Sequence, residues 1–291
     1  MPSPLTSRLE VLAAAVLFST GGAVIKACSL TSWQVASFRS AVATIVVLLM
    51  MPEARRHWSP RSIAVGAAYA ATMILYVTAN KLTTAANTIF LQYTSPLYIL
   101  LLEPWLLDEP IRRRDLTFLC VLGGGLAFFF LDSDRGTATA PHPALGNALA
   151  LLSGVAWALT AIGLRSMAHG AGSDRATAGT AIVCGNLIAA LACGTLAFPV
   201  AHAREVDWLL VTYLGVFQIS GAYFFLTRGL RAVSALEATL LLLLEPVLNP
   251  VWAWSIHGER PGPWSLGGGA VILVATAVKT WDESRRTGGE S

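Results

Sequence analysis

Charged side chains are scarce in this sequence. Only 13% of its 291 residues are Asp, Glu, Lys or Arg, whereas 55% are hydrophobic and the mean hydropathy is +0.61. A soluble chain of this length normally carries about 25% charged residues to cover its surface. The shortage therefore excludes a soluble globule and predicts an integral membrane protein.

Residues that hold metals or form disulfides are also few. The four cysteines lie within or at the end of apolar stretches, which predicts neither a disulfide framework nor a metal cluster. The five histidines fall in loops or at the ends of those stretches, and no His/Asp/Glu spacing suits a metal or an activated nucleophile. No catalytic residue, metal or cofactor is expected, and an intramembrane enzyme is a distant alternative.

Long apolar runs are what the sequence has instead. A bilayer core of about 30 Å requires about 20 helical residues, because lipid leaves backbone polar groups without partners outside a helix. Ten runs approach that length, and they predict an all-α integral membrane protein with ten transmembrane helices, the first retained and not cleaved as a signal. The ten are Leu9–Cys28, Ser32–Met51, Ser62–Leu82, Ala85–Leu107, Leu116–Leu131, Leu145–Met167, Ala176–Phe198, Trp208–Leu230, Val233–Ile256 and Trp264–Thr280.

The basic residues are distributed unevenly between the two sides of these runs. Of the 20 Lys and Arg residues, 14 fall on one side and 5 on the other, while Arg39 lies inside the second run. Because positive loops stay in the cytoplasm, both termini are expected there, in a multi-pass protein of a bacterial inner membrane. The net charge of +3 is explained by the basic loops that set the orientation in the membrane, so no nucleic-acid partner is expected. The protein is expected to contact membrane lipid, and the distribution of charges is compatible with a monomer.

The two halves of the sequence resemble each other. A shift of 150 positions places QYTSPLYILLLEPWLLDEP, which begins at Gln92, on LLLEPVLNPVWAWSIHGER, which begins at Leu242; a shift of 139 places Phe18 on Trp157. Each half holds five runs, so the second half must enter the membrane inverted. Two inverted five-helix repeats around a central cavity are typical of carriers. The expected division is a first repeat at 1–131, a periplasmic linker at 132–144, a second repeat at 145–282 and a cytoplasmic tail at 283–291.

The same residues carry a family resemblance. The run L-E-P-x-x-x-P-x-x-A-W followed by G-E-R, and the G-N-A-L-A-L-L-S-G-V-A-W-A start of the second half, resemble the EamA family of the drug/metabolite transporter superfamily. Within it, the Y-x-x-P of the first half is similar to the YddG-type aromatic amino-acid exporters. The resemblance implies a secondary exporter of small metabolites, and the outward direction rests on it alone.

Prolines interrupt two of the predicted helices in the middle of the membrane. Pro96 and Pro246 each remove a backbone donor, and Pro250 removes another one turn later. The freed carbonyls need partners, so these faces are expected to look onto protein or a wet cavity, as helix breaks or gates. A packing kink is the alternative for either proline alone.

Glu245 lies next to Pro246, too deep for its side chain to reach the surface. It either binds a substrate ammonium or a coupling proton, or it ties helices together in an ion pair, for which Arg39 is the obvious partner.

Polar and aromatic residues cluster at the same depth. Rings with one polar tip suit an apolar cavity in which a few polar groups fix the orientation of the ligand, although each alone could serve helix packing. The candidate substrate-binding residues are Trp157, Tyr93, Glu245, Asn249, Gln92, Ser95, Tyr98, Tyr76 and Tyr223.

These observations favour a secondary transporter that exports aromatic or other apolar amino acids, or similar small metabolites, by alternating access. The alternatives are an exporter of another cargo, such as a nucleobase derivative or a cationic drug, and a channel. Whether export is coupled to protons or driven by the substrate gradient stays open.

Overall fold

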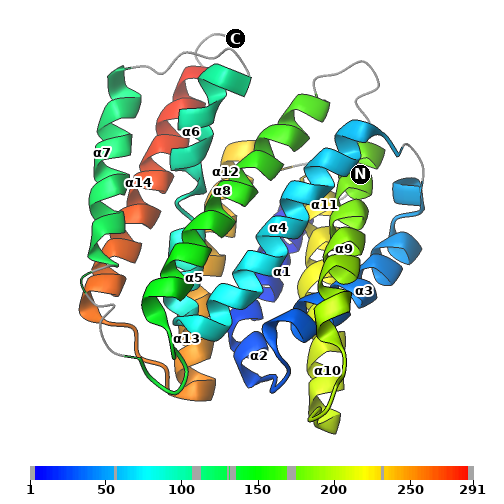
Figure 1. Cartoon of the computed structure of the whole chain (residues 1–291). Coiled ribbons are helices and arrows are strands. Elements are labelled where there is room, and N and C mark those ends of the chain that lie inside the picture. Colours follow the sequence, from blue (N-terminus) through cyan, green and yellow to red (C-terminus); the bar gives the residue numbers. More distant parts are fainter. Residues whose placement is uncertain are drawn as a thin grey trace.

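The protein is a bundle of helices that run between two ends (Figure 1). The computed structural model describes residues 4–55, 58–106, 113–129, 131, 136–168, 175–230 and 233–287. A short 3-10 turn, η1, covers Pro52–Arg55, and a π-helix, η2, covers Leu214–Gly221. The α-helices are α1 (Pro4–Ser19), α2 (Gly21–Ala27), α3 (Ser32–Met50), α4 (Pro60–Leu82), α5 (Ala85–Gln92), α6 (Ser95–Leu106), α7 (Arg113–Phe128), α8 (Pro143–Ala168), α9 (Arg175–Ala197), α10 (Glu205–Tyr213), α11 (Ala222–Gly229), α12 (Ala235–Leu242), α13 (Leu244–His257) and α14 (Pro263–Thr287).

Each of the ten predicted spans coincides with one helix or with consecutive helices, which confirms an all-helical membrane protein. Within the described ranges, seven stretches are long and apolar enough to cross a membrane. The three others are the fourth span, which α5 and α6 share; the fifth, where the apolar part of α7 is only Asp115–Phe128; and the tenth, α14.

The packing of the helices reproduces the inverted repeat. Helix α3 packs on α9 and α7 packs on α14, so the second and fifth spans of each half contact their own counterparts. The contact of α4 with α8 is matched by that of α11 with α1, which is the same pair with the halves exchanged. The start of α1 and the end of α14 both lie toward the upper end of the bundle (Figure 1).

Helix caps mark the repeat at the level of single atoms. The Thr84 hydroxyl accepts a hydrogen bond from the Asn87 backbone N–H at 3.0 Å and starts α5. The Ser234 hydroxyl does the same with the Glu237 N–H at 3.2 Å and starts α12. Both are ordinary N-caps, and they stand 150 positions apart, the shift read from the sequence.

The fourth and ninth spans are broken where the prolines predict. Helix α5 ends at Gln92 and α6 begins at Ser95, while α12 ends at Leu242 and α13 begins at Leu244. Pro96 and Pro246 therefore fall in the first turn of α6 and of α13, where a missing backbone donor is tolerated.

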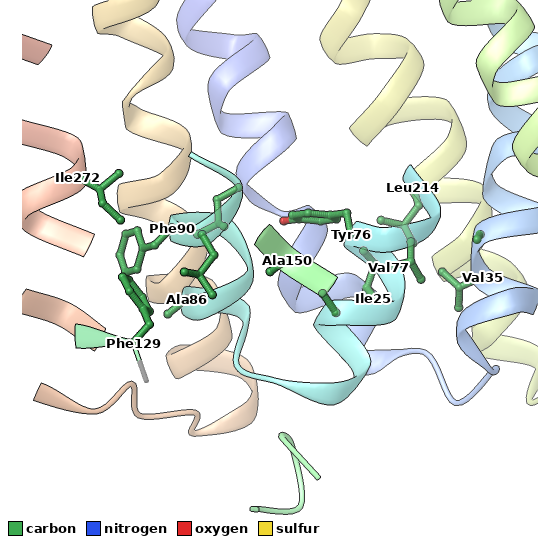
Figure 2. Close-up of a cluster of buried hydrophobic side chains, with 14 of the residues drawn as sticks. Ile25, Val35, Tyr76, Val77, Ala86, Phe90, Phe129, Ala150, Leu214 and Ile272 are labelled. Carbon is green, nitrogen blue, oxygen red and sulfur yellow. The ribbon is translucent and has the colours of Figure 1, made fainter. Parts of the chain in front are cut away.

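The main buried cluster packs the broken fourth span against the fifth span of each half. Figure 2 shows Phe90 of α5 against Phe129, which follows α7, and Ile272 of α14, and all three are buried. The Phe90 and Phe129 ring centroids are 6.1 Å apart. Tyr76 of α4 belongs to the same cluster and leads toward the site.

Candidate functional site

A cavity of about 380 Å³ lies at the middle depth of the bundle, where the helix breaks meet α1, α3, α4 and α8. Its wall combines aromatic, apolar and polar side chains from both halves of the chain. The residues that line it are Phe18, Arg39, Tyr69, Thr72, Met73, Tyr76, Gln92, Tyr93, Ser95, Pro96, Ile99, Trp157, Gln218, Ile219, Tyr223, Leu226, Thr239, Leu242, Leu243, Glu245 and Thr276.

Tyr93 joins the two helix breaks across this cavity. Its hydroxyl lies 2.9 Å from the Glu245 carboxylate and 3.3 Å from the Leu242 carbonyl oxygen. Leu242 is four residues before Pro246, so its carbonyl is the one that the proline leaves without a helical partner. The break therefore presents a carboxylate and a carbonyl to the same hydroxyl, at the wall of the cavity.

The expected ion pair between Arg39 and Glu245 does not form. Among the described residues, no carboxylate lies within 4.0 Å of the Arg39 guanidinium. Its Nη2 instead lies 3.2 Å from the Met73 carbonyl oxygen and 3.5 Å from the Met73 sulfur. Since Tyr93 donates to Glu245 and Met73 accepts from Arg39, each charge contacts a neutral group and both line the cavity.

Aromatic rings form one continuous part of the wall. The Phe18 and Tyr223 rings meet edge to face with centroids 5.2 Å apart, and Tyr69 meets Tyr223 in the same way at 6.0 Å. Trp157 packs against this cluster from α8. An apolar side chain of a ligand would thus meet ring faces and edges on several sides.

The polar residues Gln92 and Ser95 also line the cavity. The Gln92 amide donates to the Ser153 hydroxyl of α8 at 2.7 Å, which leaves its carbonyl oxygen available. Gln92 is the last residue of α5, directly before the helix break.

Seven of the nine candidate substrate-binding residues therefore share one wall, together with Pro96 and Arg39. Asn249 and Tyr98 do not line it. Asn249 is fully buried behind the wall and donates to the Tyr76 hydroxyl at 3.2 Å. Pro246 and Pro250 also lie outside the lining.

Several lining residues were missed, although the sequence marks some of them. Tyr69, Thr72, Met73 and Tyr76 follow the i, i+3, i+4, i+7 spacing of one helix face, and all four line the cavity. Tyr76 alone was predicted, so extending its stripe back along α4 would have found the rest.

Phe18 and Gln218 were missed for different reasons. Phe18 aligns with Trp157 at the shift of 139 positions, so the comparison of the two halves could have identified Phe18 as a cavity residue. Gln218 reaches the cavity from η2, and π-helical turns are frequent at functional sites. Nothing in the sequence around Gln218 marks a π-helix.

The described residues contain no group of three or more His, Cys, Asp or Glu side chains arranged to hold a metal ion. The wall is apolar and aromatic, with an acid and a base that do not touch. This arrangement suits the binding of a small organic molecule.

An all-helical bundle with inverted repeats and a cavity at its middle defines a multi-pass membrane transporter. The sequence matches the EamA-like transporter family over residues 8–131 and 144–281, and the chain belongs to that family.

Individual relatives agree with this assignment. The chain is 26% identical over 275 residues to the pseudopaline exporter CntI of Pseudomonas aeruginosa, in strains UCBPP-PA14 and PAO1, over 92% of this chain and 93% of the relative. A crystal structure at 21% identity superposes with a TM-score of 0.63 over 97% of this chain and 99% of the other, which shows the shared fold. Family and relatives indicate a transporter of small molecules and not an enzyme.

Proposed function

We propose that this chain is a secondary transporter that exports aromatic or other apolar amino acids, or similar small metabolites, across the inner membrane by alternating access. The observation that carries the proposal is the cavity itself. Glu245 lies at the junction of two helix breaks and faces a space walled by aromatic rings. An ammonium group could pair with the carboxylate while the side chain of the ligand packs on the rings.

The size of the cavity favours a small cargo. Its volume of about 380 Å³ is near the lower end of the roughly 300–1,000 Å³ that ligand pockets span. A sugar nucleotide would need more room and several cations for its phosphates, whereas Arg39 is the one basic residue in the described wall. A single amino acid, including an aromatic one, suits the space and the charges.

The outward direction is supported by the relatives, which are exporters by name. The uneven distribution of basic residues supports cytoplasmic termini. With that orientation the upper end of the bundle in Figure 1 faces the cytoplasm.

Counterflow in liposomes tests the proposal. Purified protein should exchange internal unlabelled amino acid for external labelled phenylalanine or leucine, in a saturable way and without altering the compound. Trp157→Ala should lower this rate more than tenfold, because it removes a large part of the aromatic wall. Trp254→Ala is the matched control, since Trp254 is 56% exposed on the outside of α13.

Glu245→Gln should also lower amino-acid exchange more than tenfold, because the amide cannot neutralise an ammonium. Glu237→Gln is its control, since Glu237 forms an exposed ion pair with Arg8. If both cavity variants exchange amino acids at the parental rate, the cavity is not the binding site.

The same liposomes separate the alternatives. Pseudopaline, a nucleobase derivative and a cationic drug belong in the panel, because a shared fold does not fix the cargo. Exchange of one of these, with none of the amino acids, would replace the proposed cargo. A chemically changed product would indicate an enzyme, and flux without saturation would indicate a channel.

A further inference from the structure

Arg39 is the feature of the cavity that the proposed function leaves unexplained. Its side chain is 1% exposed, and it lines the cavity from the first half of α3. The Nε–H group has no hydrogen-bond partner, and no carboxylate of the described residues lies within 4.0 Å of the guanidinium. Among the residues that the structure describes, its hydrogen bonds go to Met73 alone.

A buried cation in this condition is costly. Taking a charge out of water costs several kcal/mol, and the penalty is recovered only by a counter-charge with good geometry. The protein supplies such counter-charges elsewhere. Lys26, which is also buried, lies 3.2 Å from the Glu259 carboxylate. Helix packing alone would be served better by an apolar residue at position 39, so the charge points to a partner that the protein itself lacks.

The backbone that carries Arg39 is held firmly. Helix α3 lies so close to η2 that a Cβ atom on Gly215 would come within 2.7 Å of the Arg39 carbonyl oxygen and 2.6 Å of Val42. A charged group on a fixed helix next to a cavity is preorganised for a ligand, because binding then needs little rearrangement.

We propose that Arg39 binds the carboxylate of a zwitterionic substrate whose ammonium group pairs with Glu245. This inference rests on the proposed function and makes it more specific: the cargo must carry both charges. Arg39 and Glu245 line one cavity without touching each other, so a molecule with a cation and an anion a few bonds apart can neutralise both at once. The planar guanidinium also matches a carboxylate in a bidentate way.

Three compounds with the same ring distinguish the two charges. Phenylalanine has both, phenethylamine lacks the carboxylate and 3-phenylpropionate lacks the ammonium. The unmodified protein should exchange phenylalanine at least tenfold faster than either of the others. Phenylalanine should also raise its midpoint of thermal unfolding, whereas phenethylamine should not. These two measurements need no variant, so they test the need for both charges even if position 39 tolerates no substitution.

Variants then assign the carboxylate to Arg39. Arg39→Gln should lower phenylalanine exchange at least tenfold and change phenethylamine exchange less than threefold. Arg39→Lys should fall between the parent and Arg39→Gln, since it keeps the charge and loses the bidentate geometry. Glu245→Gln should have the opposite preference and spare 3-phenylpropionate.

The outcomes separate the two proposals. If the unmodified protein exchanges none of a panel of apolar amino acids, the proposed function fails and this inference fails with it. If it exchanges amino acids but handles phenethylamine equally well, only the role of Arg39 is overturned. The same conclusion follows if Arg39→Gln lowers exchange of all three compounds in parallel, because a structural role predicts that result.

Discussion

Removing one charge from the buried Lys26–Glu259 pair should open the lower end of the bundle. Both side chains are almost inaccessible, with 4% and 2% exposure, and the ammonium lies 3.2 Å from the carboxylate as an ion pair without hydrogen-bond geometry. Lys26 also donates to the carbonyls of Thr83 at 2.8 Å and Thr139 at 2.6 Å. The other carboxylate oxygen accepts the Ala85 N–H at 3.0 Å. One ion pair therefore joins α2, α5 and the segments that precede α8 and α14.

The expected effect of Lys26→Met follows from these contacts. The substitution leaves a buried carboxylate without its counter-ion and two carbonyls without donors. Breaking one partner of a buried pair costs about 3–5 kcal/mol. If that cost falls on the closed arrangement alone, the ratio of open to closed molecules rises roughly 10²- to 4,000-fold, since every 1.4 kcal/mol or so is a factor of ten.

The chain contains its own reporter for this opening. Cys28, which follows α2 directly, is 2% exposed, and its carbonyl accepts a hydrogen bond from Lys81. In a background that carries Cys120→Ser, because Cys120 is exposed, a membrane-impermeant maleimide should label Cys28 slowly. Lys26→Met should raise the labelling rate at least tenfold.

A matched control comes from the other half of the repeat. Arg165 aligns with Lys26, but its ion pair with Glu103 is 46% exposed at the arginine, and exposed pairs contribute only about 0–1 kcal/mol. Arg165→Met should therefore leave Cys28 labelling nearly unchanged. In Lys26→Met/Glu259→Met, labelling should return toward the parental rate, because no charge is left unpaired. A labelling rate within threefold of the parent in Lys26→Met would refute the reasoning.

Two further predictions concern the stability of the bundle. Gly268→Ala should lower the free energy of unfolding by about 1–3 kcal/mol, because a Cβ there would meet the Gly125 carbonyl at 2.6 Å and Phe129 at 2.7 Å. Gly267→Ala is the control and should be neutral or slightly stabilising, since no atom would lie closer than 3.9 Å to its Cβ. Thermal unfolding in detergent compares the two, and equal midpoints would contradict the close approach of α7 and α14. Asp207→Asn should lower the free energy of unfolding by about 2–4 kcal/mol in the same assay. The fully buried carboxylate accepts the Ser29 N–H at 2.7 Å and the Arg204 N–H at 2.8 Å, and both hydrogen bonds are charge-assisted. An unchanged midpoint would show that these hydrogen bonds do not stabilise the fold.

The architecture was predictable because lipid leaves the backbone few choices. Apolar runs of about 20 residues must be helices, and an odd number of them in each of two similar halves requires inversion. The caps at Thr84 and Ser234 confirm the register of the repeat, since they are 150 positions apart. The π-helix at Leu214–Gly221 could not be predicted, because it depends on how α10 and α11 pack and on no local signal.

The sequence predicts which residues line the site better than it predicts which of them contact each other. The candidates were chosen by proline positions, membrane depth and aromatic content, and seven of the nine line the cavity. The pairing within that wall was not predictable, because it depends on rotation of the helices about their axes. The sequence suggested Arg39 as the partner of Glu245 since both are isolated charges, yet Tyr93 occupies that place. Asn249 has the right depth but lies behind the wall, bound to Tyr76.

The two ends of the bundle differ in a way that matters for the proposed mechanism. Under an inverted repeat, Lys26 and Arg165 are equivalent positions on opposite sides of the membrane. Lys26 is buried in an ion pair, whereas Arg165 forms its pair at an exposed surface. Alternating access by such repeats consists of the two halves exchanging conformations, so one end must be closed while the other is open. The buried pair belongs to the end of the bundle away from the termini, where α2 carries Lys26, and the exposed pair to the opposite end (Figure 1). If the buried pair closes its end and the termini are cytoplasmic, as we propose, the cavity that contains Arg39 and Glu245 takes its cargo from the inside, as the proposed export requires.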